Sequence, residues 1–186
     1  MTSSERQRIL DLAHSTGAIE RGDFVLSSGA RSHYYFDGRR LTLHPEGSHA
    51  VGKAIYNILK DTEVAAVGGP TLGADPMVAS VALVSYLEGH PISAFIVRRE
   101  PKRYGTRRLI EGPNLPKGAK VAILDDVITS GSAIFRAIDA AEREGWVVVK
   151  VVAILDRMEG GSDQIQKRGY DFEALFTSED LGEKKQ

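Results

Sequence analysis

Two adjacent carboxylates, Asp125 and Asp126, stand shortly before a turn of small residues, Thr129-Ser-Gly-Ser132. Hydroxyl side chains, a glycine that admits close backbone approach and the unpaired N–H groups of a helix start all favour a bound phosphate. The two acids would repel a phosphate beside them, and they suit neutral hydroxyl groups or a hydrated Mg²⁺ better. The pattern therefore predicts a ligand with a phosphate at one end and sugar hydroxyls nearby, as in a phosphorylated ribose.

The segments around this turn predict a strand before it and a helix after it. Four apolar residues, 121–124, precede the acids, and apolar residues at helical spacing run from Ile134 to Ala141 before Gly145. The turn holds no Lys, which a Walker loop requires, and no G-x-G-x-x-G pattern. An ordinary turn capped by Ser or Thr is the alternative interpretation, and the adjacent acids make it the weaker one.

Two further segments could bind anions. Residues 68–76, with Thr71 and the backbone around Gly73, predict a second strand–loop–helix phosphate cradle, and a plain strand-to-helix connection explains that segment alone equally well. Residues 98–108 hold six Arg and Lys in eleven positions, together with a Pro and a Gly that discourage a helix. Such a segment is usually a solvated basic loop, but in a nearly neutral chain it also suits a pyrophosphate leaving group.

Arg157 follows a nearly continuous apolar run at 146–155, which predicts a parallel strand covered on both faces. Ligands bind at the carboxyl ends of such strands, and the planar fork of Arg matches a carboxylate. The alternative is a salt bridge between Arg157 and Asp156 or Glu159.

The stretch VAILDDVITSGSA resembles the phosphoribosyl-pyrophosphate (PRPP) signature of the type I phosphoribosyltransferases. Four further segments, FVLSSGARSHYYFDGRR, IVRREPKRYG, RLIEG and ILDRMEGG, resemble the orotate phosphoribosyltransferases of that family. The similarity runs from about Phe24 to about Gly161. It implies Mg²⁺-dependent transfer of ribose 5-phosphate from PRPP to orotate, giving orotidine 5′-monophosphate and pyrophosphate in UMP biosynthesis.

The resemblance also assigns residues by position. Lys102, Asp125 and Asp126 would be catalytic, and Tyr35, Phe36, Thr129 and Arg157 would bind orotate. The residues implied for PRPP are Thr71, Gly73, Arg98, Arg99, Lys102, Tyr104, Asp125, Asp126, Val127, Ile128, Thr129, Ser130, Gly131, Ser132 and Ala133. Magnesium would arrive with PRPP, near Asp125, without a certain protein ligand. Three positions depart from the family pattern. Some members carry Lys where this chain has Ser27 and Gly73, and members usually carry His where it has Tyr104.

The expected fold is α/β, a phosphoribosyltransferase-like parallel sheet of about five strands with helices on both faces. One domain is expected over 1–186, with a small N-terminal hood at about 20–42 and a core at about 45–178. Within the hood, the consecutive aromatics at 34–36 cannot all face inward, because strand side chains alternate. The tail at 179–186 is expected to fray.

The composition of the chain limits which partners it is expected to bind. The 186 residues include no Cys, and the net charge of −1 predicts no attraction to nucleic acid or membrane. The N-terminus lacks an apolar signal core, so a cytoplasmic protein is the default expectation. The resemblance further implies a homodimer in which the basic loop of one subunit serves the partner's site.

Two other functions compete with the orotate reaction. One is a purine phosphoribosyltransferase, which Arg157 argues against because a purine has no carboxylate to pair. The other is a regulatory relative that binds PRPP without turnover. Lys102 and the lack of a basic nucleic-acid surface argue against that alternative.

Overall fold

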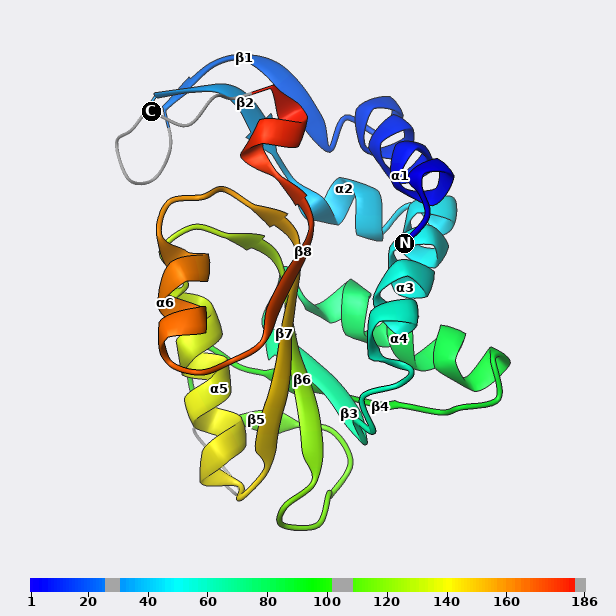
Figure 1. Cartoon of the computed structure of the whole chain (residues 1–186), viewed down its shortest axis with the longest axis vertical. Helices are drawn as coiled ribbons and strands as arrows, with labels where there is room; N and C mark the ends of the chain where they lie inside the picture. The colour runs from blue at the N-terminus through cyan, green and yellow to red at the C-terminus, as the bar shows by residue number, and fades with distance from the viewer. Residues whose placement is uncertain (26–30, 102–108, 183–186) are drawn as a thin grey trace.

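The computed structural model describes residues 1–25, 31–101 and 109–182. Within these ranges, a six-stranded sheet has the order β5-β4-β3-β6-β7-β8 (Figure 1). Neighbouring strands pair in parallel, except that β5 runs antiparallel to β4 at one edge. The strands are β3 (Ala66–Pro70), β4 (Ser93–Val97), β5 (Ile110–Glu111), β6 (Lys120–Ile128), β7 (Val147–Asp156) and β8 (Phe172–Thr177). The expected α/β class with a parallel sheet is confirmed.

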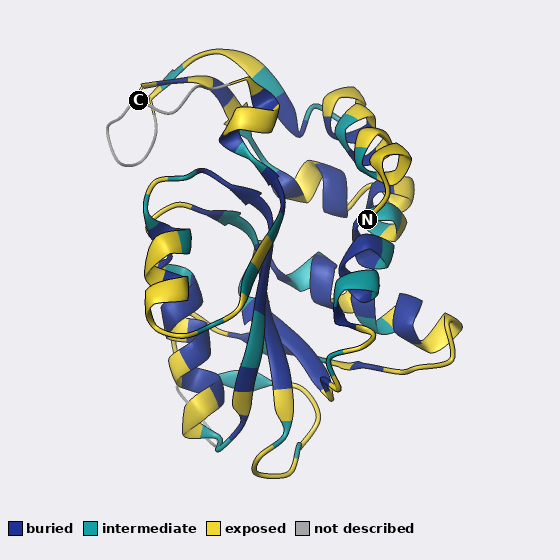
Figure 2. Cartoon of the chain, in the orientation of Figure 1, coloured by how far each residue is buried: buried dark blue, intermediate teal, exposed yellow. Residues whose placement is uncertain are grey.

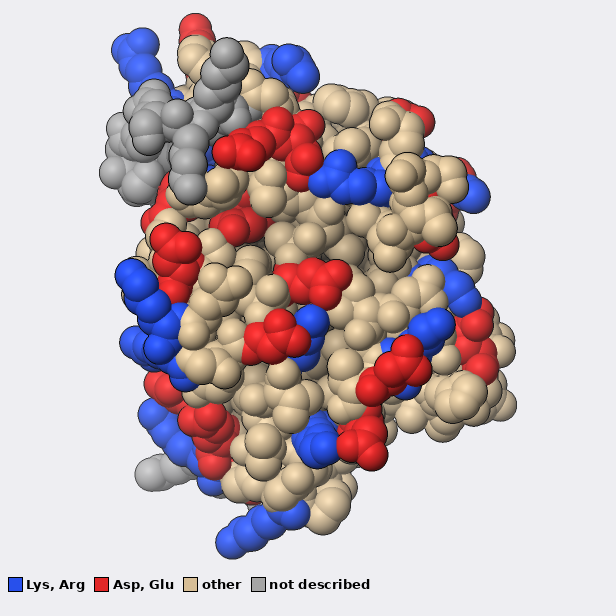
Figure 3. All heavy atoms as spheres, viewed as in Figure 1, with Lys and Arg blue, Asp and Glu red and all other residues tan. Residues whose placement is uncertain are grey.

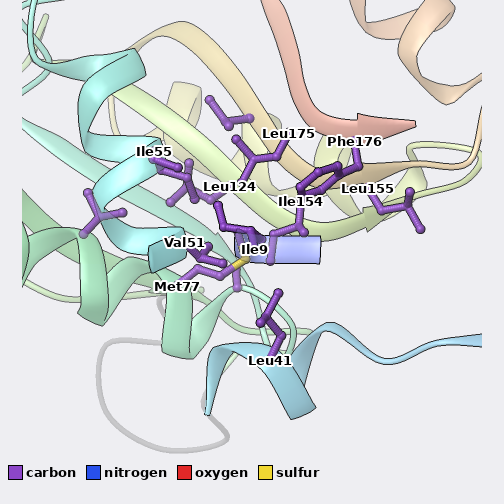
Figure 4. Packing of buried hydrophobic residues seen from close by; sticks show 14 of the residues in the cluster. Ile9, Leu41, Val51, Ile55, Met77, Leu124, Ile154, Leu155, Leu175 and Phe176 are labelled. Carbon is purple, nitrogen blue, oxygen red and sulfur yellow. The ribbon is translucent and has the colours of Figure 1, made fainter. Parts of the chain in front are cut away.

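Helices cover both faces of this sheet (Figure 1). One face carries α1 (Ser3–Ser15), α3 (Pro45–Leu59) and α4 (Asp75–Leu87), and the other carries α5 (Ser132–Arg143) and α6 (Gly161–Lys167). Each face has its own cluster of buried apolar side chains. The first cluster joins helices to strands, and Figure 4 shows its labelled residues Ile55, Met77, Leu124 and Phe176 packed together.

The apolar runs in the sequence explain why β6 and β7 lie at the centre. Residues 121–125 of β6 and 151–156 of β7 are buried, as expected for strands covered on both faces (Figure 2). Helix α3 is amphipathic: with Pro45 at its first position, it buries Val51, Ile55 and Leu59 in the cluster on its side of the sheet. The strands are therefore fixed by burial, and their carboxyl ends are held in register.

The hood consists of the antiparallel hairpin β1 (Ile19–Val25) and β2 (Arg31–Phe36), followed by α2 (Gly38–Thr42). It lies over the carboxyl ends of the parallel strands (Figure 1). Along β2 the side chains alternate: Tyr34 is buried, whereas Tyr35 is 40% exposed. The prediction that the three aromatics cannot all face inward is confirmed.

Three short elements differ from the sequence-based expectation. Neither the two-residue β5 nor the five-residue α2 was expected. The tail was expected to fray from Glu179, which is wrong for its first residues, because a 3₁₀ turn, η1 (Ser178–Leu181), is held by an ion pair between Asp180 and Arg6. Over the described ranges, no helix is both long enough and apolar enough to span a bilayer.

Candidate active site

A cavity of about 290 Å³ lies where the hood meets the carboxyl ends of β3 and β6. Hood, sheet and helix residues all contribute to its wall. Of the residues that the sequence singled out, those lining it are Tyr35, Phe36, Thr71, Gly73, Arg99, Asp125, Asp126 and Ala133. The structure therefore brings together segments that are far apart in the sequence.

The paired carboxylates stand at the end of β6. Asp125 is 7% exposed, and one of its carboxylate oxygens accepts the backbone N–H of Asp126 at 3.0 Å. Burial and the neighbouring charge of Asp126 raise the pKa of Asp125 well above its usual range. Burial likewise raises the pKa of Asp126. Both pKa shifts show that the folded protein holds negative charge here at a free-energy cost, which a bound cation or hydroxyl donors would offset.

Two glycines make room for Asp126. A Cβ atom added at Gly38 would lie 2.6 Å from the Cβ of Asp126, and one added at Gly73 would lie 2.8 Å from its carboxylate carbon. Gly38 belongs to α2 of the hood and Gly73 to the loop after β3. Asp126 is thus held between the hood and the sheet, and a side chain at either glycine would displace it.

Two arginines of the cavity wall, Arg39 and Arg136, were not among the predicted site residues. Arg39 is held by Asp37, with Nε 2.8 Å from the carboxylate, and its charge lowers the pKa of Asp126 against the larger effect of burial. Arg136 acts in the same direction on the pKa of Asp125. Its position three residues after Ala133 was the available signal, because residues three apart share a helix face.

The turn after β6 is open for an anion. Gly131 has a left-handed φ of 77° at the start of α5, and no side chain caps that helix. Its first N–H groups therefore lack a side-chain acceptor within the described residues, and they favour negative charge. A backbone hydrogen bond holds the turn, in which the N–H of Gly161 donates to the Thr129 carbonyl at 2.9 Å. The geometry agrees with the predicted phosphate cradle.

The loop after β3 offers fewer side-chain donors than expected. The Thr71 hydroxyl donates to the carboxylate of Asp75 at 3.2 Å, so it is engaged by its own helix. Backbone N–H groups of Leu72 and Gly73 donate to no backbone acceptor among the described residues. The peptide bond between Thr71 and Leu72 is cis. Among the described residues of this loop, backbone N–H groups are therefore the available donors, and anion binding here stays a prediction.

Arg157 lies outside the cavity wall, beneath the hood. Its Nε donates to Glu159 at 2.8 Å and its Nη2 to the Ser32 hydroxyl at 3.2 Å. Its guanidinium also stacks 4.8 Å from the centre of the Tyr34 ring. The alternative interpretation of Arg157, an ion pair with Glu159, is therefore present, and its contact with orotate stays a prediction.

The remaining predicted residues fall into three groups. Lys102 and Tyr104 lie outside the described residues, as does Ser27. Arg98 does not line the cavity, and its Nη1 lies 3.5 Å from the Glu111 carboxylate. The residues of the turn from Val127 to Ser132 adjoin the cavity without lining it, whereas Ala133 lines it.

The donor set fits a magnesium ion that arrives with its ligand. Within the described residues, no group of three or more His, Asp, Glu or Cys side chains could hold a metal ion. Asp125 and Asp126, however, provide two adjacent carboxylates that form no ion pair with a Lys, Arg or His of the described residues. Mg²⁺ commonly takes one or two protein carboxylates and completes its shell with water and phosphate oxygens.

The fold and the site define a class of proteins. The family described as phosphoribosyl transferase domain matches residues 39–175. An orotate phosphoribosyltransferase of Nostoc sp. is 47% identical over 185 residues, covering 99% of this chain and 88% of that protein. One of Aquifex aeolicus is 41% identical, covering 97% and 100%. A crystal structure of the Mycobacterium tuberculosis orotate phosphoribosyltransferase with Fe(III) dicitrate is 34% identical, with a TM-score of 0.84 and coverage of 96% and 99%. The chain belongs to the orotate phosphoribosyltransferase family.

Proposed function

We propose that the protein transfers ribose 5-phosphate from PRPP to orotate, releasing pyrophosphate and forming orotidine 5′-monophosphate for pyrimidine biosynthesis. The observation that carries this proposal is the pair of carboxylates lining one cavity, buried Asp125 and half-buried Asp126, beside an uncapped helix start. Carboxylates suit ribose hydroxyls, and the helix start suits the 5′-phosphate. Family membership supports the choice of orotate as the acceptor.

The proposed mechanism assigns charge stabilisation to the two carboxylates. As the bond from ribose C1 to pyrophosphate stretches, positive charge develops on the sugar. Asp125 is fixed before the reaction by burial, and half-buried Asp126 by its packing against Gly38 and Gly73, so their negative charge favours that cation without reorganisation. Arg99 and Arg136, which line the same cavity, would stabilise the pyrophosphate that leaves. The orotate nitrogen then attacks C1.

Magnesium belongs to the proposal as a partner of the two carboxylates. Asp125 or Asp126 would hold it, and it would neutralise charge on the pyrophosphate group when bound. The remaining ligands would come from water and from PRPP. Cytoplasmic location stays a prediction from the sequence.

The proposal includes a homodimer. The outward face of α4 exposes three large apolar side chains, Leu83 at 61%, Tyr86 at 71% and Leu87 at 70%. Contiguous exposed apolar side chains mark interaction sites. These residues lie at the end of α4 from which the chain passes into β4, on the side of the helix turned away from the sheet. This face is the proposed contact between subunits, and the reach of the basic segment into the partner's site rests on the resemblance.

The reaction is tested by orotate absorbance. Adding PRPP and Mg²⁺ should consume orotate, and pyrophosphate should reverse the change. A panel of purine bases under the same conditions is the control. Turnover of a purine without turnover of orotate would overturn the proposal.

The shared site is tested by mixing two inactive variants, Lys102→Ala and Asp126→Asn. Refolded together at equal amounts, they should form heterodimers about half the time, each with one intact site, so that about a quarter of parental activity returns. If mass measurement confirms heterodimers and no activity returns, Lys102 acts within its own chain.

A further inference from the structure

A second hollow, of about 180 Å³, adjoins the cavity between α5 and the end of β4. Arginines dominate its wall. Arg99 and Arg136 line both the cavity and this hollow, which places the two spaces side by side. Arg98 and Arg143 line the hollow without lining the cavity.

The positive charge of this hollow is largely uncompensated. Arg98 lies near the carboxylate of Glu111, at 3.5 Å. The other three arginines form no ion pair with any carboxylate in the part of the chain that the structure describes. Asp139 is the one acid among the described lining residues. Four guanidinium groups around one carboxylate are a local concentration of positive charge in a chain whose net charge is −1.

The spacing of the arginines favours an anion with more than one phosphate. Arg136 and Arg143 stand seven residues apart on α5, close to two turns, so they share a face and their Cα atoms lie about 10 Å apart along the helix. Both side chains line one hollow, so a phosphate chain can contact both. Guanidinium groups also match phosphate oxygens in pairs, which an ammonium group cannot do.

We propose that this hollow is a second anion site, which binds inorganic pyrophosphate or another oligophosphate beside the catalytic cavity. Arg143 is the residue to test, since it lines the hollow without lining the cavity and, unlike Arg98, has no ion pair among the described residues. Arg99 and Arg136 join the two sites, so an anion released in the cavity can pass to the hollow without leaving arginine contact. The assignment of pyrophosphate as the natural ligand rests on the proposed function, but anion binding itself does not.

The test is titration calorimetry of the full chain with sodium pyrophosphate. Low ionic strength is required, because salt screens exposed charges. The wild-type protein should bind two pyrophosphate ions per chain. Arg143→Gln should weaken one binding event about tenfold or more and leave the other unchanged. Arg21→Gln, which removes an exposed arginine of the hood, is the matched control and should keep both events.

Kinetics provide the second measurement. Initial orotate turnover in Arg143→Gln, without added pyrophosphate, should match the parent, and thermal unfolding should confirm that the variant is folded. One pyrophosphate per chain, or two that are indifferent to Arg143→Gln, would overturn the second site. Two binding events in a protein that fails to convert orotate would instead refute the proposed function and leave the site standing.

Discussion

Replacing Asp126 with Asn should make the ligand-free protein more stable and the enzyme much less active. Asn has nearly the same shape as Asp, so it fits between Gly38 and Gly73 without a new clash. The substitution removes the half-buried member of two neighbouring carboxyl groups, each of which has a raised pKa. The free energy of unfolding should therefore rise by about 1–3 kcal/mol, the usual scale for a poorly compensated polar group. For a chain of this size that corresponds to an increase of about 2–12 °C in Tm.

The stability gain of the Asn variant depends on pH. Burial raises the pKa of Asp126 in the folded state. The carboxyl group therefore makes its full contribution to stability at pH values below the ordinary carboxyl pKa, and this contribution is lost as the pH rises through the raised pKa. The Asn variant does not titrate at this position. Its stability advantage should consequently be largest at neutral pH and should shrink toward pH 4, measured by thermal unfolding across that range.

Activity should change in the opposite direction. Loss of a charge that faces the developing cation should lower kcat by at least ~10²-fold, or about 2.7 kcal/mol in the barrier. Asp61→Asn, an exposed carboxylate outside the cavity, is the matched control and should change neither property appreciably. An Asn variant that is less stable at neutral pH, or whose advantage is independent of pH, would refute this account of the carboxylates.

Three other substitutions test the site. Arg157→Gln should raise the KM for orotate about tenfold and leave the KM for PRPP nearly unchanged, since a charge-assisted hydrogen bond is worth about 1.5–3 kcal/mol. An unchanged KM for orotate would leave Arg157 with a structural role only. Gly73→Ala should lower kcat/KM for PRPP at least ~10-fold by pushing Asp126 aside, and parental steady-state kinetics would contradict the close packing. Gly161→Ala should cost about 1–3 kcal/mol in unfolding experiments and weaken PRPP, because its Cβ would lie 2.8 Å from the Gly131 nitrogen; full stability with unchanged PRPP affinity would count against the supporting role of that contact.

The central elements could be predicted because their sequence signals are strong. Apolar runs predicted the five parallel strands, and the periodic patterns predicted the long helices. The short elements could not be predicted in this way. Two residues of β5 form a strand only through pairing with β4, and α2 is too short to show a period. The turn η1 depends on Arg6 at the other end of the chain, so no local pattern marks it.

The candidate site shows the same division. Asp125, Asp126 and the turn after them were predicted because an unusual group of residue types stands in one segment. Arg136 was missed despite its spacing from Ala133, since an exposed arginine on an amphipathic helix usually faces solvent. The pairing of Arg157 with the hood depends on Ser32 and Tyr34, which are remote in sequence.

The anchoring of the hood bears on how substrates reach the cavity. The Tyr34 hydroxyl lies 3.1 Å from the Ser178 hydroxyl, which in turn donates to the Arg157 carbonyl at 2.8 Å. Lifting the hairpin would break these buried contacts and also separate Gly38 from Asp126. The hood is therefore a fixed wall of the cavity. The shape that this wall presents is set before any ligand arrives.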